Sequence, residues 1–331
     1  MKSLFSPGAA LASLGLMLAA CGGGGVKSTP MPDTPPPAPG GTPTPTPAPG
    51  TPAPIPTLPP TPAPGTPAPV PGGGGSYDTI ADLVEKPQDY TFQTAGIRLV
   101  SAASVETLAF GNDLKIEYLA LQGGLGTYRL TGRGGATSDF AIGLEVQLDP
   151  QTVRYDGLGN ADTLILIVPK VGGVNLSYTM LGAWTHFGQD AYLYLAAGGV
   201  PTRAANMPKS GRATYSTLLT GSALSAGNIY SLNAYSSAAF SADFASGKVD
   251  LEMTLTGIAA SSDFKDFGTV SGTGTIAGSN PGFQGALTGS GGVTGVYSGA
   301  FFGPAAAEMG MGWNVKGADY EARGMNAGRK N

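Results

Sequence analysis

Hydrophobic and polar residues alternate over long stretches of the C-terminal part of the chain. The clearest stretch is 249–256, VDLEMTLT, in which every second residue is apolar and the residues between are acidic or threonine. Successive side chains of a strand point to opposite faces of the sheet, so this period of two predicts a strand with one buried face. Ser246-Gly247 precedes the stretch and suits a tight hairpin turn.

Similar stretches recur and predict an antiparallel meander. The expected strands are Arg212–Thr220, Ile229–Tyr235, Ala239–Phe244, Val249–Thr256, Thr269–Ala277, Gly282–Thr288, Val293–Phe302 and Ala307–Val315. About eight strands is the size at which a sheet closes into a barrel filled by its own side chains. The sequence therefore predicts an eight-stranded antiparallel β-barrel over 205–317. Residues 318–331 are polar and are expected to form a frayed tail.

Residues 77–204 contain shorter apolar runs separated by turn residues. Thr79 and Asp82 have the spacing of a capping box, so we expect a short helix that ends at Pro87. The expected strands are Ile116–Leu121, Thr127–Thr131, Thr152–Tyr155, Thr163–Val168, Leu176–Trp184 and Asp190–Ala196. Among them, 163–168 is continuously apolar, which favours a strand inside the sheet. These segments predict a small, mostly antiparallel β subdomain.

The N-terminus carries the features of an exported lipoprotein. A lysine at position 2 precedes a short apolar run over 4–18, and Leu18-Ala19-Ala20 leads into Cys21. The run is too short to span a bilayer, and small residues before a cleavage point are typical of a signal peptide. The segment resembles a bacterial lipobox, which implies a signal peptide over 1–20 and a lipidated Cys21. Gly22 follows in place of an aspartate, which by the same resemblance favours the outer membrane.

Residues 21–76 are almost wholly proline, threonine, alanine and glycine. The sequence TPAPGTPAP occurs at 46–54 and again at 61–69. Such a composition cannot bury enough apolar surface to offset the entropy of the chain, and it favours extended polyproline II conformations. We expect a disordered, jointed stalk between the lipid anchor and the folded part.

Composition narrows the class of protein further. The chain has 18 lysines and arginines against 22 aspartates and glutamates, a formal net charge of −4. There is thus no basic excess of the kind that attracts nucleic acid, and we expect no nucleic-acid partner. Cys21 is the only cysteine, so no intrachain disulfide can stabilise the fold.

The segment 299–310, GAFFGPAAAEMG, carries a resemblance to a known family. It resembles the closing hairpin of the transferrin-binding protein B barrel, with the aromatic pair at Phe301 and Phe302, the turn at Gly303-Pro304, the acidic residue at Glu308 and the first of two glycines at Gly310. Met311 stands where the second glycine is usual. The segment 208–215 is similar to the entry strand of that barrel, and 242–249 is similar to one of its hairpins.

The resemblance implies a handle-like subdomain over 77–204 followed by the barrel, as a single unit where the full receptor has two. It also implies an outer-membrane surface lipoprotein, lipid-anchored, that captures a macromolecular or iron- or haem-carrying ligand as a co-receptor in iron acquisition. The partners it implies are a protein ligand, a TonB-dependent outer-membrane receptor and an outer-membrane translocator for lipoproteins.

Three side chains are candidates for binding a ligand: His186, Tyr297 and Trp313. His186 is the only histidine and precedes Asp190 by four residues. It suits an axial haem ligand, a base in Ser-His-Asp chemistry, or a loop histidine bonded locally, and the lack of a ligand cluster favours the last. Tyr297 and Trp313 fit the barrel core better than a binding cage. Glu308 fits a structural partner for backbone N–H groups or for a nearby cation at the turn.

No catalytic constellation is evident in the sequence. It has no P-loop, no Gly-x-Gly-x-x-Gly that opens a helix, and no His/Cys cluster with metal-ligand spacing. The sequence therefore predicts a binding protein, not an enzyme, without a resident cofactor or metal. Two alternatives stay open: a carrier of haem or another small ligand, and a structural envelope lipoprotein without a specific ligand.

Overall fold

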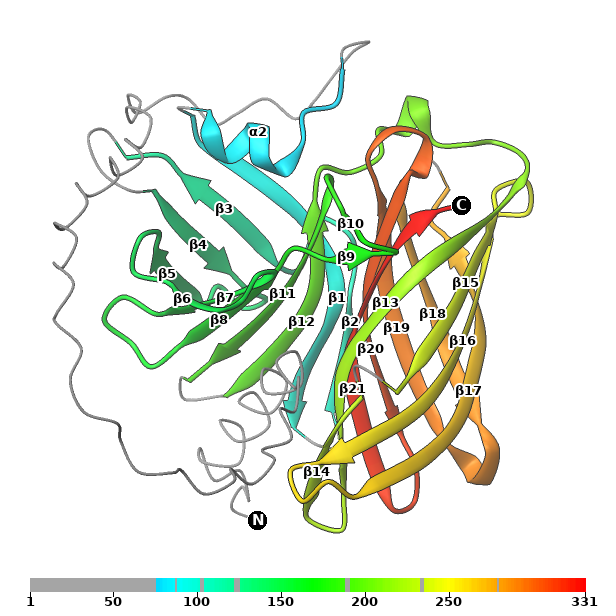
Figure 1. The fold of residues 1–331 in the computed structure, drawn as a ribbon. Coiled ribbons are helices and arrows are strands. Elements are labelled where there is room, and N and C mark those ends of the chain that lie inside the picture. Colours follow the sequence, from blue (N-terminus) through cyan, green and yellow to red (C-terminus); the bar gives the residue numbers. More distant parts are fainter. Residues whose placement is uncertain are drawn as a thin grey trace, which may run out of the picture.

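The computed structural model describes residues 76–86, 88–101, 104–121, 126–187, 191–232, 235–278 and 280–331. The predicted signal peptide, Cys21 and the stalk up to residue 75 lie outside the described residues. The described chain forms two antiparallel sheets that lie side by side (Figure 1).

The first sheet has ten strands and a concave, apolar side. Its strands follow the order β5-β4-β3-β1-β12-β11-β8-β7-β6, with β2 paired to β1. Their bounds are β1 Tyr90–Ser101, β2 Ser104–Leu108, β3 Lys115–Leu119, β4 Thr127–Thr131, β5 Thr137–Ala141, β6 Val146–Asp149, β7 Thr152–Asp156, β8 Thr163–Ile167, β11 Thr179–His186 and β12 Tyr192–Gly199. The sheet curls, because Leu158 after β7 donates a backbone hydrogen bond of 2.8 Å to Asp139 on the edge strand β5. A separate hairpin, β9 (Lys170–Val171) and β10 (Val174–Asn175), follows β8.

A single short helix, α2 (Ile80–Glu85), precedes the first sheet among the described residues. Thr79 and Asp82 form the capping box that the sequence predicts: each side chain accepts a hydrogen bond from the backbone N–H of the other. Leu83 is buried against the core of the sheet. The predicted strand over 163–168 is confirmed as β8, which lies inside the sheet between β11 and β7.

The second sheet closes into the predicted eight-stranded barrel. The bounds are β13 Arg212–Ser225, β14 Asn228–Ser231, β15 Ser237–Asp243, β16 Lys248–Ala259, β17 Phe264–Ile276, β18 Gly282–Gly289, β19 Thr294–Phe302, β20 Glu308–Lys316 and β21 Tyr320–Lys330. Closure is made by β13 and β21, which pair from Tyr215↔Lys330 to Ser225↔Tyr320. The short strands β14 and β15 pair in turn with different parts of both β13 and β16, so they fill one position in the barrel.

The prediction that residues 318–331 form a polar, frayed tail is wrong. They contain β21, whose inner face carries Ala322 and Asn326 while its outer face packs Met325 and Ala327 against the first sheet. Both faces of β21 are buried and several of its side chains are small or polar, so no apolar period of two marks the strand. The expected number of strands is right, although β14 and β15 were expected as two positions and β21 was missed.

The two sheets share a hydrophobic core. Ile97, Leu181 and Leu195 of the first sheet pack in one cluster with Phe302 and Met325 of the barrel. Glycines allow the close approach: a Cβ added at Gly312 on β20 would lie 2.1 Å from the carbonyl oxygen of Leu195 on β12. The barrel and the curled sheet therefore form one body.

Candidate functional site

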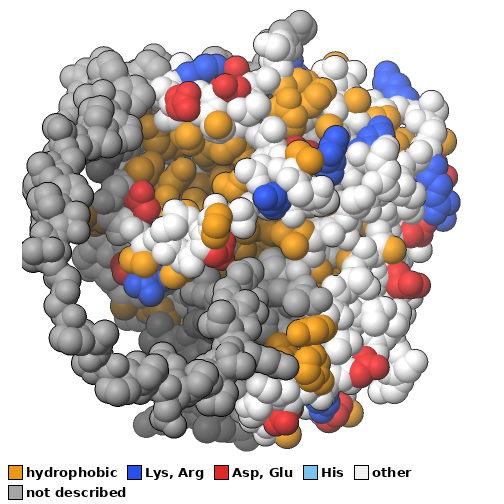
Figure 2. Space-filling view, in the orientation of Figure 1, with side chains coloured by type: hydrophobic (Ala, Val, Ile, Leu, Met, Phe, Trp, Pro, Cys, Tyr) orange, Lys and Arg blue, Asp and Glu red, His pale blue; other side chains and the backbone are white. Residues whose placement is uncertain are grey.

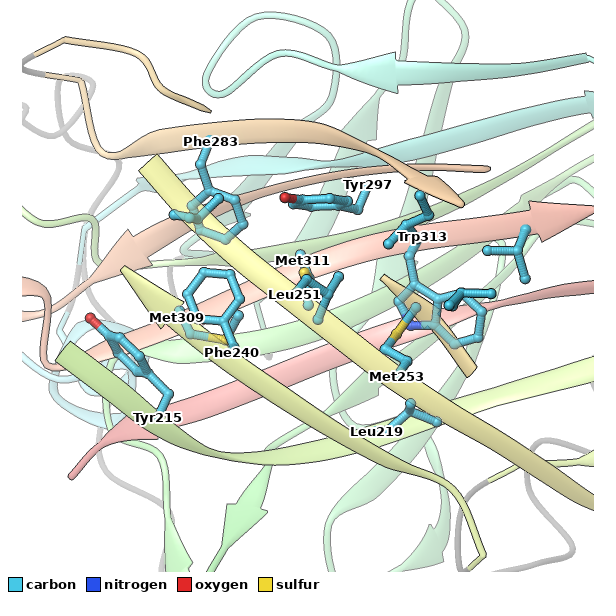
Figure 3. Packing of buried hydrophobic residues seen from close by; sticks show 14 of the residues in the cluster. Tyr215, Leu219, Phe240, Leu251, Met253, Phe283, Tyr297, Met309, Met311 and Trp313 are labelled. Atoms are coloured by element: carbon cyan, nitrogen blue, oxygen red, sulfur yellow. The ribbon is translucent and has the colours of Figure 1, made fainter. Parts of the chain in front are cut away.

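The interior of the barrel is filled by its own side chains. Figure 3 shows Tyr215, Phe240, Leu251, Met253, Phe283, Tyr297, Met309, Met311 and Trp313 pointing toward one another from the barrel strands. None of these side chains is more than 4% exposed. The interior of the barrel is thus a packed core that leaves no room for a ligand.

Tyr297 belongs to this core. Its ring lies over two glycines of neighbouring strands, because a Cβ at Gly285 would meet the ring at 2.6 Å and a Cβ at Gly274 would meet the hydroxyl at 2.5 Å. Burial raises the pKa of the Tyr297 phenol well above its ordinary value. The hydroxyl has no hydrogen-bond partner among the described residues.

Trp313 is also a core residue, and it is fully buried. Its indole Nε1 donates a 3.1 Å hydrogen bond to Oδ1 of Asn326 on β21. This bond satisfies the indole N–H inside the barrel, as buried tryptophans usually require. Trp313 and Tyr297 thus lie together in the barrel core, away from solvent.

His186 lies in the first sheet, in a different cluster, so the structure does not bring the three candidate residues together. Its Nδ1 is 2.7 Å from Oδ2 of Asp162, a carboxylate that is 1% exposed. Asp162 also accepts hydrogen bonds from Ser138, from Trp184 Nε1 at 3.1 Å and from the Phe187 N–H at 2.8 Å.

Burial raises the pKa of Asp162, but the hydrogen bonds from Phe187, Ser138 and His186 outweigh it, so the pKa lies below its ordinary value. This geometry differs from a Ser-His-Asp triad, in which the hydroxyl faces the imidazole, because Ser138 donates to the carboxylate instead. The His186 ring stacks on Tyr192, with ring centroids 5.1 Å apart.

The hairpin motif lies where the barrel meets the first sheet. Glu308 is buried, and its carboxylate accepts hydrogen bonds from the backbone N–H groups of Ser177 at 2.8 Å and Tyr178 at 2.9 Å. Burial raises the pKa of Glu308 above its ordinary value, even though these backbone N–H groups act to lower it.

The other residues of the motif also lie in the packed core or form the turn. Phe301 is in the barrel core and Phe302 in the core shared with the first sheet. Gly303 has a φ of +70° and packs on the ring of Tyr178, and Pro304 begins a short 3₁₀ turn. Gly310 permits close contact with Ala197 of β12.

Sequence reasoning missed a pair of exposed aromatic side chains on the barrel. Tyr235 is 50% exposed and Phe264 is 59% exposed, and their rings meet edge to face with centroids 4.8 Å apart. Leu224, near the end of β13, is 46% exposed. The only signal in the sequence was an aromatic residue among charged neighbours, DFKD at 263–266, where no strand was expected to begin.

These side chains lie toward one end of the barrel, which we call the distal end. It is formed by the turns that follow β13, β16, β18 and β20, seen at the bottom of Figure 1. The described chain begins at the opposite end: Ser76 accepts a 3.1 Å hydrogen bond from Arg203, which precedes β13. The 14 residues of β13 separate the two ends by about 45 Å of strand.

The described residues include neither a membrane-spanning helix nor a metal cluster. No helix in this part of the chain has the length and apolarity that a membrane span requires. Within the same residues, no group of three or more His, Cys, Asp or Glu side chains is placed to hold a metal ion.

Comparisons with known proteins found similarity among solved structures only. No family model matches the chain. No curated protein matches it either. A mutant of the vaccine antigen transferrin-binding protein B from Haemophilus parasuis Hp5 is 18% identical, with a TM-score of 0.42, over 72% of this chain and 44% of that chain.

Two further structures are of the same kind. The isotype 1 transferrin-binding protein B from serogroup B Neisseria meningitidis is 16% identical, with a TM-score of 0.38, over 67% of this chain and 52% of that one. The N-lobe of lactoferrin-binding protein B of Moraxella bovis is 15% identical, with a TM-score of 0.31, over 47% and 77%.

The chain thus spans about half the length of the transferrin-binding proteins that it matches. Because the identities and TM-scores are this low, a function for the chain has to be inferred from its own geometry. The resemblance to transferrin-binding protein B that the hairpin motif indicates is found again among the solved structures.

Proposed function

We propose that this protein is a surface lipoprotein of the bacterial outer membrane that binds a protein ligand with the distal end of its barrel. The observation that carries the proposal is the exposed pair Tyr235 and Phe264. Aromatic side chains are enriched at the centres of protein interfaces, where they contribute much of the binding energy. The packed barrel core supports the proposal, because it leaves no room for a ligand inside the barrel.

The placement of the pair fits a tethered protein. A lipidated Cys21 followed by an extended stalk over 21–76 would hold the molecule by the end at which Ser76 lies. At about 3.1 Å per residue such a stalk reaches on the order of 100 Å. The distal end would then face away from the membrane, toward a soluble ligand.

The ligand that we propose is an iron-carrying protein. The structural neighbours are named for binding transferrin and lactoferrin, and the hairpin motif resembles the same family. In this role the protein would act as a co-receptor that passes its ligand to a TonB-dependent receptor, after an outer-membrane translocator has placed it on the surface.

The test is a binding assay on a biosensor with iron-loaded transferrin and iron-loaded lactoferrin as probes. We expect saturable binding of one of them, weakened at least tenfold by Phe264→Ala and by Tyr235→Ala. Leu144→Ala is the matched control, because Leu144 is 71% exposed but lies in the first sheet region. If neither probe binds, or if Leu144→Ala weakens binding as much as Phe264→Ala, the proposal fails.

A second candidate function, a carrier of haem, is favoured by the geometry of His186. A carboxylate on Nδ1, here that of Asp162, is the arrangement that orients imidazoles for binding a metal through Nε2. A bound haem would supply an iron atom to which an imidazole nitrogen coordinates. A haemin titration followed by absorbance tests it: a stoichiometric Soret shift that His186→Ala abolishes would support this function. A Soret shift that does not saturate, or one that His186→Ala leaves unchanged, would exclude the haem-carrier function.

A further inference from the structure

The outer wall of the barrel has a trough of about 440 Å³ that the proposed function does not use. It runs over β13, β15, β16 and β17. The lining residues outside the barrel core are Thr214, Ala239, Ser241, Asp250, Glu252, Ser271 and Thr273. Gly272 also lines the trough, as do Tyr215, Phe240 and Leu251, whose side chains belong to the barrel core. We call it the outer-wall trough.

The trough exists because β15 carries only short side chains on its outward face. Ala239 and Ser241 alternate with the inward Phe240, and they lie between longer residues of the flanking strands. Arg212 on β13 stands on one side, and Asp250 and Glu252 on β16 stand on the other.

A hydrogen-bond network fixes the side chains at one end of the trough. Arg212 donates from Nη2 to Oδ2 of Asp250 at 2.8 Å and to the hydroxyl of Ser241 at 3.0 Å. The hydroxyl of Thr273 donates to Oδ1 of Asp250 at 3.0 Å. Arg212 of β13 and Thr273 of β17 thus hold Asp250 in place before any ligand arrives. Preorganised polar groups lose less entropy when they bind.

Glu252 is different, because it has neither an ion-pair nor a hydrogen-bond partner among the described residues. It is exposed and lies beside Ser271 of β17 in the sheet register. The trough therefore offers a free carboxylate as an acceptor, with hydroxyls at hand that both donate and accept.

The charges of the trough exclude several classes of ligand. Arg212 compensates Asp250, so Glu252 leaves one net negative charge. A phosphate or carboxylate would be repelled, and a strongly basic peptide would find a single uncompensated partner. An apolar ligand would cover hydroxyls and carboxylates without satisfying them. Figure 2 shows the same character over the barrel half, where most of the surface is neither hydrophobic nor charged.

We propose that the outer-wall trough binds a short, uncharged oligosaccharide. Sugar hydroxyls both donate and accept hydrogen bonds, which matches the Ser/Thr hydroxyls, and they donate to carboxylates such as that of Glu252. The volume lies in the range of about 300–1,000 Å³ that is usual for small-molecule sites. The trough is on the side wall and not at the distal end, so this proposal stands independently of the protein ligand.

The experiment is saturation-transfer NMR on the full chain with maltotriose, cellotriose and triacetylchitotriose as probes. Trilysine is the comparison probe and represents basic peptides. We expect a saturable signal from at least one trisaccharide. Ala239→Arg, which fills the trough from an exposed position, should weaken binding at least tenfold. Glu252→Gln should weaken it several-fold.

The control is Gln284→Ala, an exposed residue of β18 that does not line the trough. It should bind like the unsubstituted protein, and circular-dichroism melts should show that all three variants are folded. Absence of a saturable signal from every trisaccharide would overturn the proposal. So would binding that Ala239→Arg and Glu252→Gln leave unchanged, or a signal from trilysine alone, which would assign the trough to basic peptides.

Discussion

Glu308 connects the barrel to the first sheet through two hydrogen bonds, and removing its carboxylate should destabilise the whole protein. The carboxylate accepts from Ser177 and Tyr178 at 2.8 and 2.9 Å while it is buried. Hydrogen bonds to a charged group contribute about 1.5–3 kcal/mol each. The cost of burying the charge offsets part of this sum. Glu308→Ala should therefore lower the free energy of unfolding by about 2–4 kcal/mol.

Urea unfolding followed by tryptophan fluorescence is a suitable assay, because each sheet holds one of the two tryptophans. Trp184 lies in the first sheet and Trp313 lies in the barrel. Since the sheets share a core, both should report one transition in the unsubstituted protein. In Glu308→Ala we expect the midpoint at a lower urea concentration. Adding Trp184→Phe leaves the fluorescence of Trp313 alone, and adding Trp313→Phe leaves that of Trp184 alone, so the two sheets can be observed separately.

The matched control is Glu252→Ala, because Glu252 is an exposed glutamate without a partner among the described residues. Substitutions at such surface positions usually change stability by less than about 0.5 kcal/mol. If Glu308→Ala shifts the midpoint no more than Glu252→Ala does, the two hydrogen bonds do not stabilise the contact between the sheets, and the reasoning is refuted.

Three further predictions concern the titration of Glu308, the titration of Asp162 and the packing of Gly312. The pKa of Glu308 is raised in the folded protein, so its protonated form adds stability that is present below the ordinary glutamate pKa and is lost as the pH rises through the pKa of the folded state. The difference in free energy of unfolding between the unsubstituted protein and Glu308→Gln should therefore narrow from pH 4 to pH 8 in urea titrations. The lowered pKa of Asp162 has the opposite sign: its stabilisation holds above the ordinary aspartate pKa and disappears as pH falls through the folded value. Urea midpoints of the protein and Asp162→Asn should therefore converge in acid. Gly312→Ala should cost about 1–3 kcal/mol in thermal melts, because its Cβ would meet the Leu195 carbonyl, whereas Gly134→Ala places a Cβ in open space and tests only the strain of its φ of +85°.

The barrel could be predicted from sequence because most of its strands have one face in the core and one in solvent. β16 is the clearest example: Val249, Leu251, Met253 and Leu255 are buried while the residues between them are exposed or half-buried. Where both faces are buried, the pattern disappears. β1 was missed for this reason, because Phe92 faces the concave core of the first sheet and Ile97 faces the barrel. β21 was missed in the same way.

The partners of the candidate site residues could not be predicted, because strand register sets them. Sequence proximity pointed from His186 to Asp190, but its partner is Asp162, which adjoins β8. The pairing of Thr185 with Thr163 brings the two together. Glu308 likewise contacts Ser177 and Tyr178, about 130 residues away in the chain. For Glu308 the sequence left backbone N–H groups and a nearby cation open as partners; the structure shows the backbone N–H groups, in a segment that the sequence did not indicate.

The arrangement of the two sheets leaves the barrel with two free surfaces. Its interior is packed, and the outer faces of β20 and β21 carry Gly312 and Met325, which contact the first sheet. The distal end and the wall over β15–β17 remain for binding, and they lie on different parts of the barrel. Phe264→Ala should therefore reduce binding of an iron-carrying protein without affecting binding of trisaccharides. Ala239→Arg should reduce binding of trisaccharides without affecting binding of the iron-carrying protein. Loss of both activities in either variant would mean that the two surfaces act as one site, or that the variant is misfolded, which its circular-dichroism melt would reveal.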